Sequence, residues 1–150
     1  MGRQAPRLVV SYRESGEAPA NRGKETVLTI PDSDLAPVAA VIVLAAGQGT
    51  RMKSALPKVV HPLAGLSMIG HALRAAQGLD PHNLVAVVRH QRDVVAAEIQ
   101  RVAPHAIIAD QDEIPGTGRA VQCGLEALDA AVTPVTGTVV VTYGDVPLLS

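Results

Sequence analysis

The chain has 150 residues, a formal net charge of −1, 47% hydrophobic residues and 18% charged residues. This composition excludes an intrinsically disordered chain and predicts a single folded core. Aromatic side chains are nearly absent and there is no basic run, which argues against nucleic-acid binding as the main activity. The single cysteine, Cys123, excludes an internal disulfide, and the longest apolar run, 38–46, falls short of the about 20 residues that a membrane span needs. We therefore expect a cytoplasmic protein that binds neither nucleic acid nor membrane.

Residues 1–37 differ in composition from the rest of the chain. They mix basic and acidic side chains, show little hydrophobic periodicity and are interrupted by several prolines. We predict a flexible amino-terminal extension over 1–37. An alternative interpretation is that a start codon chosen too far upstream has added these residues.

From residue 38 onward, apolar runs typical of buried strands alternate with segments of helical periodicity. Strands are predicted at 39–46, 84–88, 106–109 and 138–143. The glycines and prolines between 47 and 66 predict that this stretch is largely loop. Strand–helix alternation at this spacing favours right-handed crossovers, so we predict an α/β fold: a Rossmann-like, three-layer αβα arrangement with a mainly parallel sheet.

Three helices are predicted between these strands. Ser67 is placed to cap the first helix and Asp93 to cap the second. The third follows a second glycine loop and should bury Val121, Leu125 and Leu128, which are spaced i, i+4 and i+7. Each helix then provides one crossover between strands.

Three polar loops leave the carboxyl ends of the predicted strands, at 47–58, 110–118 and 143–147. Ligands of open parallel sheets bind at this edge. In the first loop, Gly47 and Gly49 let backbone N–H groups approach phosphate oxygens. Arg51 offers a planar set of hydrogen-bond donors, and Lys58 offers a compact positive charge. Both side chains therefore suit the binding of a triphosphate. The loop therefore predicts a nucleoside triphosphate site.

Other interpretations of the first loop are weaker. A dinucleotide-binding fingerprint would need a third glycine where Met52 stands, and an acid after the second strand, where the chain has Arg89 and His90. A P-loop would also need glycine at the position of Met52. Arg51 and Lys58 could be ordinary surface cations, although their place in a loop shaped by glycine and proline argues against it.

A family resemblance rests on these residues. The string LAAGQGTRM at 44–52, with Pro57-Lys58, resembles the signature of the sugar-nucleotide pyrophosphorylases. The longer string at 51–65 resembles a narrower family, the bacterial bifunctional N-acetylglucosamine-1-phosphate uridyltransferases/glucosamine-1-phosphate acetyltransferases. Gln111, the glycine loop at 116–118 and YGDVPL at 143–148 match that family in order and spacing. Residues 38–150 resemble the amino-terminal, nucleotide-binding part of its nucleotidyltransferase domain.

The resemblance implies a UTP site. The nucleotide and substrate would be bound by Leu44, Ala45, Ala46, Gly47, Gly49, Thr50, Arg51, Lys58, Gln111, Gly116, Thr117, Tyr143, Gly144 and Asp145. Gln111 would read the uracil edge, since a side-chain amide offers both a donor and an acceptor. Asp145 would bind Mg²⁺. Arg51 and Lys58 would be catalytic, because they offset the charge that develops during transfer.

The implied reaction joins N-acetylglucosamine 1-phosphate to UTP. The sugar phosphate attacks the α-phosphorus of UTP, which gives UDP-N-acetylglucosamine for cell-wall precursor synthesis and releases pyrophosphate. Positioning and charge neutralisation, rather than covalent catalysis, carry such a reaction.

The chain departs from the family's pattern in two respects. Arg119 stands where the family usually has histidine, and either points outward or adds a cation near the site. The family's domain also continues well beyond Asp145, with sugar-binding residues, a second metal ligand and then a β-helix that carries the acetyltransferase and is needed for the family's homotrimer. Two alternatives therefore stay open: an inactive fragment that binds UTP or a UDP-sugar, and another sugar-1-phosphate nucleotidyltransferase or a cytidylyltransferase.

Overall fold

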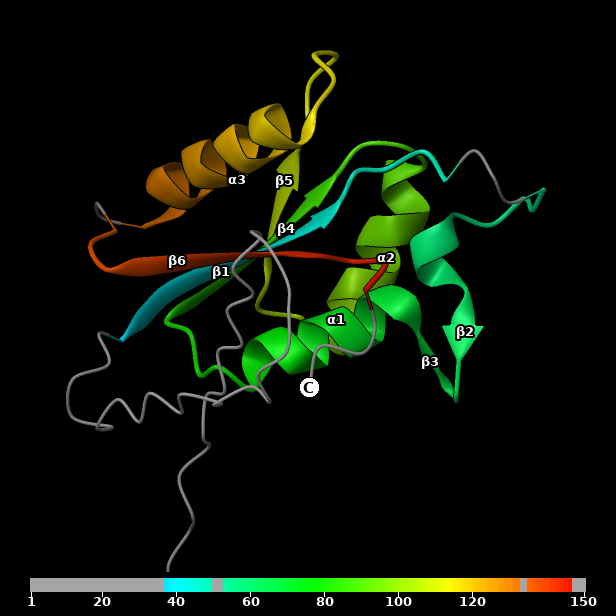
Figure 1. Ribbon diagram of the computed structural model, residues 1–150, viewed down its shortest axis with the longest axis horizontal. Helices are drawn as coiled ribbons and strands as arrows, with labels where there is room; N and C mark the ends of the chain where they lie inside the picture. The colour runs from blue at the N-terminus through cyan, green and yellow to red at the C-terminus, as the bar shows by residue number, and fades with distance from the viewer. Residues whose placement is uncertain (1–36, 50–52, 133–134, 147–150) are drawn as a thin grey trace, which may run out of the picture. The chain divides into compact units, whose positions relative to one another are not determined.

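The structure, a computed structural model, describes residues 37–49, 53–132 and 135–146. It contains a parallel sheet of β1 (Val38–Ala45), β4 (Asn83–Val88), β5 (Ile107–Asp110) and β6 (Thr138–Tyr143), in the spatial order β5-β4-β1-β6 (Figure 1). The four predicted strands are confirmed, with small shifts at their ends. The extension predicted over 1–37 lies, except for Pro37, outside the described residues.

The strand order reverses at β1. The chain first builds outward from β1 through β4 to β5, and then returns to the other side of β1 as β6. The apolar side chains of β1 explain its place, because every residue from Ala39 to Ala45 is buried. In sheets of this kind, ligands bind where the order reverses, at the carboxyl ends of the strands. Here that point lies between β1 and β6.

Helices cover both faces of the sheet. α1 (Met68–Gln77) and α2 (Arg92–Val102) pack on one face, and α3 (Thr117–Ala131) packs on the other (Figure 1). Alternate residues of β1 serve the two cores: Val41 and Val43 face α1 and α2, and Ile42 faces α3. The predicted three-layer α/β fold is confirmed. In the described part of the chain, no helix has the length and apolar character needed to span a membrane.

The connection between β1 and α1 is more ordered than the sequence predicts. The expectation that 47–66 is largely loop is partly wrong, because the stretch contains the 3-10 helix η2 (Lys58–Val60) and a small hairpin of β2 (Pro62–Leu63) and β3 (Leu66–Ser67). The hairpin turns at Ala64 and Gly65, whose φ angles are 49° and 83°. Two successive left-handed residues match the twist of a tight hairpin, and the strands are too short to show in the apolar pattern.

The helix starts confirm one predicted cap and correct the other. Ser67 caps α1, and its hydroxyl accepts a hydrogen bond from the Gly70 N–H at 3.1 Å. The Asp93 cap is wrong: α2 begins after Gln91, which has a φ of 47° and makes no side-chain cap. The turn at Gln91 already starts the helix, and Asp93 lies within its first turn, where a carboxylate still interacts favourably with the helix dipole.

The buried stripe of α3 also differs from the prediction. Leu128 is buried as expected, but Val121 is only partly buried and Leu125 is 37% exposed. The helix buries small residues instead, and a Cβ at Gly124 would lie 3.0 Å from side-chain atoms of Ile42 and Val87. Because α3 approaches the sheet closely at Gly124, its larger side chains Val121 and Leu125 lie at the edge of the contact between helix and sheet.

A hydrogen-bonded chain of polar side chains ties α1 to α2. The Ser67 hydroxyl donates to Glu98 Oε1 at 2.5 Å, and Arg101 donates to both oxygens of Glu98 at 2.9 and 2.7 Å. The bonds from Arg101, and then that from Ser67, hold the pKa of Glu98 below its usual value against the opposing effect of partial burial. The ionised form of Glu98 therefore stabilises the fold.

This lowered pKa predicts the pH dependence of stability. Because the folded-state pKa lies below the unfolded one, the contribution of Glu98 is complete above about pH 4.3 and is lost as the pH falls through the folded pKa. Glu98→Gln should lower the free energy of unfolding by about 1 kcal/mol at pH 7 and by less at pH 3, measured by urea denaturation. The exposed Glu113 provides the control, since Glu113→Gln should change neither value. A Glu98→Gln effect of the same size at both pH values would contradict the prediction.

Candidate functional site

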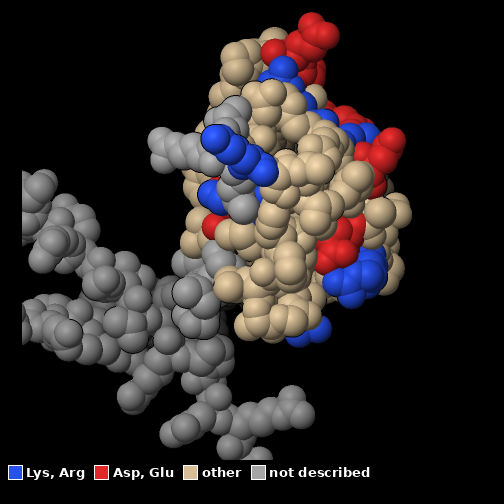
Figure 2. Space-filling view, turned by 90° about the vertical axis from the view of Figure 1, so that its right-hand side faces the viewer, with Lys and Arg blue, Asp and Glu red and all other residues tan. Residues whose placement is uncertain are grey.

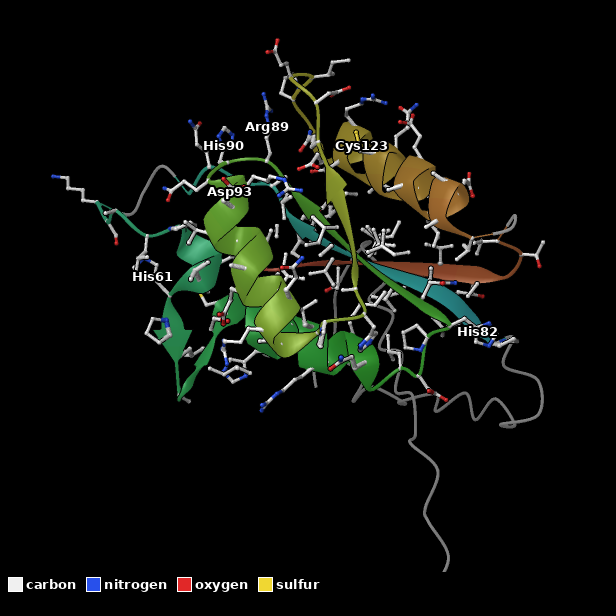
Figure 3. All side chains as sticks on the ribbon, turned by 180° about the vertical axis from the view of Figure 1, so that it is seen from behind. His61, His82, Arg89, His90, Asp93 and Cys123 are labelled. Atoms are coloured by element: carbon white, nitrogen blue, oxygen red, sulfur yellow. The ribbon has the colours of Figure 1, made fainter. Side chains whose placement is uncertain are left out.

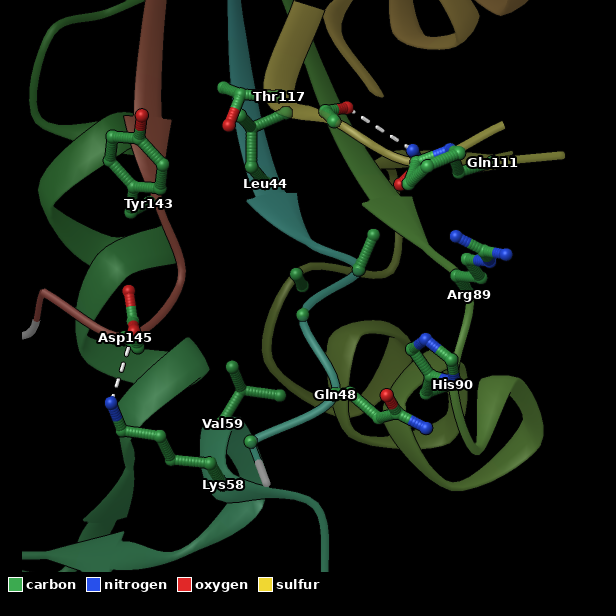
Figure 4. Close-up of a pocket in the computed structure, with 16 residues that line it drawn as sticks. Leu44, Gln48, Lys58, Val59, Arg89, His90, Gln111, Thr117, Tyr143 and Asp145 are labelled. Carbon is green, nitrogen blue, oxygen red and sulfur yellow. Dashed lines mark hydrogen bonds and ion pairs between the residues drawn. The ribbon is translucent and has the colours of Figure 1, made fainter. Parts of the chain in front are cut away.

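A cavity of about 450 Å³ opens at the carboxyl ends of β1, β4, β5 and β6 (Figure 4). The residues of the predicted site that line it are Leu44, Ala45, Ala46, Gly47, Gly49, Lys58, Gln111, Gly116, Thr117, Tyr143 and Asp145. Gly144 is buried next to the cavity. Thr50 and Arg51 lie outside the described residues. The structure thus brings the three predicted loops to one place.

Other residues, which the sequence pattern does not single out for the site, also line the cavity: Gln48, Val59, Arg89, His90 and Pro115. Arg89 and His90 follow β4 directly, and Figure 3 shows them near the first turn of α2, where Asp93 is labelled. A signal was available for both, because all strands of a parallel sheet end at the same edge. The segment after β4 therefore belongs with the other three loops at this edge.

At one end of the cavity, Gly49 and Lys58 lie against each other. Gly49 has a φ of +58°, and a Cβ there would lie 3.0 Å from the Cβ of Lys58. Lys58 is the first residue of η2, which is held to the core through the buried Val59. A glycine is thus needed at position 49 for its backbone conformation and for the close approach of the lysine.

Lys58 and Asp145 form an ion pair across this end of the cavity. Lys58 Nζ lies 3.1 Å from Asp145 Oδ2, and each side chain is 40% exposed (Figure 4). An ion pair this exposed contributes only about 0–1 kcal/mol. An anionic ligand can therefore draw Lys58 away at little cost, which leaves the carboxylate free for a cation.

Gly144 sets the position of Asp145. Its N–H donates to the carbonyl of Leu44 at 2.8 Å, so that the chain stays beside β1 after β6 ends. A Cβ at position 144 would lie 2.7 Å from Ile69 Cδ1 and 3.2 Å from the carbonyl oxygen of Leu44. Only glycine fits this contact without a shift of the neighbouring chain.

Gly144→Ala should consequently destabilise the fold and displace Asp145. We expect a loss of about 1–3 kcal/mol in the free energy of unfolding from overpacking, measured by urea denaturation. Gly118→Ala is the matched control, because nothing lies within 4 Å of a Cβ there. An unchanged stability of Gly144→Ala would show that the segment after β6 is not fixed by this contact.

Gln111 is held by the loop that it begins. Its N–H donates to the carbonyl of Val88 at 2.8 Å, continuing the β4–β5 ladder. Its side-chain nitrogen donates to the carbonyls of Ile114 at 2.9 Å and Gly116 at 3.2 Å. The amide is therefore fixed at the edge of the cavity before any ligand binds.

Arginines brace the loop at 110–116 from outside the cavity. Arg119 does not line the cavity; it bonds to Asp112 and also pairs with Glu126 at 3.3 Å. The hydrogen bond from Arg119 holds the pKa of Asp112 below its usual value. Arg92 Nε donates to Asp110 Oδ1 at 2.7 Å at the start of the loop. Two ion pairs thus connect this loop to the first turns of α2 and α3.

Charged side chains are mixed in sign over the surface. On the face drawn in Figure 2, basic side chains lie beside acidic ones, and uncharged surface separates these mixed groups from one another. Neither sign forms a continuous patch over the described residues of that face. Among the described residues that line the cavity, Lys58 and Arg89 carry positive charge.

The doubly covered parallel sheet, with a glycine-bearing loop and a lysine at its switch point, has the architecture of a nucleotidyltransferase. Residues 41–150 match the family model described as a MobA-like NTP transferase domain. The chain belongs to this family.

Curated relatives and solved structures agree with this class. The chain is 63% identical over 112 residues to the bifunctional protein GlmU of Pseudarthrobacter chlorophenolicus, a match that covers 75% of this chain and 23% of the relative. It is 62% identical over 112 residues to GlmU of Kineococcus radiotolerans, with 75% of this chain and 22% of the relative covered. The chain thus spans less than a quarter of the length of these relatives.

The similar structures include a nucleotidyl transferase from Methanothermobacter thermautotroptrophicus, with a TM-score of 0.60 and 20% identity over 74% of this chain and 52% of that one. Another is Rv0371C of Mycobacterium tuberculosis in complex with manganese, with a TM-score of 0.55 and 21% identity over 74% of this chain and 52% of that one. At these identities the likeness concerns the fold alone, and it supports the nucleotidyltransferase architecture.

Proposed function

We propose that the cavity binds UTP and serves a uridyltransferase that forms UDP-N-acetylglucosamine and pyrophosphate from UTP and N-acetylglucosamine 1-phosphate. The observation that carries the proposal is the meeting of Lys58, Asp145 and Gln111 around one cavity next to the loop at 47–49. The similarity to proteins named GlmU supports the choice of sugar nucleotide. A cytoplasmic location, with access to UTP, and a role in cell-wall precursor synthesis belong to the same proposal.

The cavity offers different chemistry at its two ends. Lys58, Gly47 and Gly49 offer a cation and backbone N–H groups, which suit the triphosphate. Gln111, with the glycine loop at 116–117, offers a polar edge and open backbone for the uracil and ribose. We place the sugar phosphate beside Tyr143 and Asp145. Arg51, which lies outside the described residues, would add its charge at the triphosphate.

Asp145 fits a magnesium site of the kind that a nucleotide completes. Mg²⁺ is usually held by one or two carboxylates together with substrate phosphates, and Asp145 offers one carboxylate at the proposed phosphate end. Among the described residues, no three His, Cys, Asp or Glu side chains lie together as a protein-only metal site. Mg²⁺ bound there would neutralise phosphate charge, while Lys58 orients the triphosphate.

A second candidate is a unit that binds the nucleotide without turnover. The chain matches 22–23% of the relatives' length, so turnover does not follow from the similarity alone. In this case the cavity would recognise UTP, but no pyrophosphate would be released.

One assay separates the candidates. The 150-residue chain is incubated with UTP, Mg²⁺ and N-acetylglucosamine 1-phosphate, pyrophosphate release is measured, and UTP binding is followed by calorimetry. Release that depends on the sugar phosphate supports the transferase, and binding without release supports the second candidate. Tighter binding of CTP than of UTP would favour a cytidylyltransferase, and no binding of either nucleotide would contradict both candidates.

A further inference from the structure

The side-chain nitrogen of Gln111 is fully used by its own loop. It donates to the carbonyls of Ile114 and Gly116, at 2.9 and 3.2 Å. A carboxamide nitrogen has two hydrogens, and both partners are carbonyl oxygens that can only accept. The nitrogen must therefore face the loop, and the amide oxygen is the atom left for a ligand. Gln111 thus presents an acceptor and no donor to the cavity.

An acceptor alone does not distinguish the two pyrimidines. The edge of uracil has an N3–H donor between two carbonyl oxygens, so an acceptor can bind N3–H. The edge of cytosine has an amino group, which the same acceptor can also bind. Cytosine keeps the C2 carbonyl but carries the amino group at C4, where uracil has its other carbonyl. Selection of uracil therefore requires a second group that donates at C4 and cannot accept from the amino group of cytosine.

Arg89 can supply such a donor. It lines the cavity, is half-buried, and its Nη2 donates to the carbonyl of Glu113 at 3.0 Å, in the loop that Gln111 begins. Figure 4 shows Arg89 and Gln111 on the same side of the cavity, away from the pair of Lys58 and Asp145. Arg89 is thus at the proposed base end of the cavity rather than at the phosphate end.

The guanidinium has donors to spare. Arginine carries five N–H groups, has no acceptor and stays charged. Within the described part of the chain, the carbonyl of Glu113 is the partner to which it donates a hydrogen bond. His90 also lines the cavity, but a neutral imidazole can either donate or accept and so discriminates less strictly.

The loop has contacts besides the one with Arg89. Arg92 pairs with Asp110 and Arg119 with Asp112, so a variant of Arg89 loses the bond to the carbonyl of Glu113 but keeps these two ion pairs. Comparison with a variant of Arg92, which also loses a contact to the loop, separates the loss of a donor in the cavity from a change in the loop.

We propose that Arg89 reads the nucleobase: its guanidinium donates a hydrogen bond to the C4 carbonyl of uracil while Gln111 accepts from N3–H, and the two together select uracil over cytosine. The inference rests on the proposed function, because it takes UTP as the ligand. It assigns a specificity-determining role to a residue after β4.

The test compares the dissociation constants of UTP and CTP, measured by calorimetry with Mg²⁺ present. The unmodified chain should bind UTP at least about 10-fold more tightly than CTP. Arg89→Met keeps the apolar stem and removes the donors, so the ratio of the two constants should fall by about 10-fold or more, toward equal binding of UTP and CTP. Arg92→Met removes an equal charge that braces the same loop and does not line the cavity; it should leave the ratio unchanged.

The outcomes separate the two proposals. If the unmodified chain binds no UTP, the proposed function fails. If it binds UTP but Arg89→Met weakens UTP and CTP by the same factor, Arg89 acts only by charge and the inference is overturned. Equal binding of UTP and CTP by the unmodified chain overturns it too. Arg89→Lys, which keeps a donor but not the fork, should give an intermediate ratio and serves where Arg89→Met does not fold.

Discussion

Replacement of Lys58 by alanine is expected to slow the proposed transfer by about 10²–10³-fold, the usual cost of removing one preorganised electrostatic contact from a transition state. Lys58 is the described cation at the phosphate end of the cavity, and the close contact with Gly49 fixes its Cβ. The measurement is the initial rate of pyrophosphate release from UTP with N-acetylglucosamine 1-phosphate. If the chain binds UTP without turnover, the dissociation constant of UTP should rise by about 10- to 100-fold instead.

Lys53→Ala is the control for this experiment. Lys53 is an exposed lysine of the same connection that does not line the cavity, so its loss changes the net charge equally and should leave the rate within about twofold, as expected for an exposed charge. The sequence also predicts that Arg51→Ala slows the transfer as much as Lys58→Ala does. Turnover close to that of the unmodified chain in both variants would reject the assignment of the loop.

The sequence predicts the fold well because the core is made of uninterrupted apolar runs. Strands buried on both faces leave such runs, and the stretch at 38–46 is long enough to identify the central strand without help from turns. Two features of the fold that the sequence does not predict depend on the detailed geometry of the backbone. The start of α2 follows from the left-handed turn at Gln91, and the buried face of α3 follows from the space next to Gly124. Neither local geometry leaves a periodic signal.

Residues of the candidate site can be predicted from the sequence where they belong to strings that resemble a known family. The loop at 44–58, Gln111 and Asp145 belong to such strings. The pairing of Lys58 with Asp145 cannot be predicted in this way, because the two are 87 positions apart and meet only when β6 returns beside β1. From the sequence alone, Arg89 indicates only that no acid follows the second strand. Its contact with the carbonyl of Glu113 requires knowledge of which strands are neighbours.

Asp145→Asn should affect nucleotide binding in opposite directions with and without metal. With Mg²⁺ present, UTP should bind at least about 10-fold more weakly, since the amide replaces the proposed ligand carboxylate and changes in metal shells typically cost this much or more. With a chelator present, the same variant should bind UTP slightly more tightly, by up to about fivefold. The carboxylate then only repels the phosphates and competes for Lys58, 3.1 Å away.

Opposite effects of Asp145→Asn on UTP binding with Mg²⁺ and with chelator would identify Asp145 as a metal-binding carboxylate. A purely structural Asp145 would give weaker binding under both conditions, because its loss would disturb the cavity whether or not metal is present. Asp93→Asn is the control, since its side chain is 96% exposed and does not line the cavity. If Asp145 binds the cation only after Lys58 has moved to the phosphates, Lys58→Ala should remove most of the gain that Asp145→Asn shows in chelator, because the competition for the lysine is then gone. The loss that Asp145→Asn shows with Mg²⁺ should remain in the double variant. A gain in chelator that persists without Lys58 would mean that repulsion of the phosphates, and not competition for the lysine, is the larger effect.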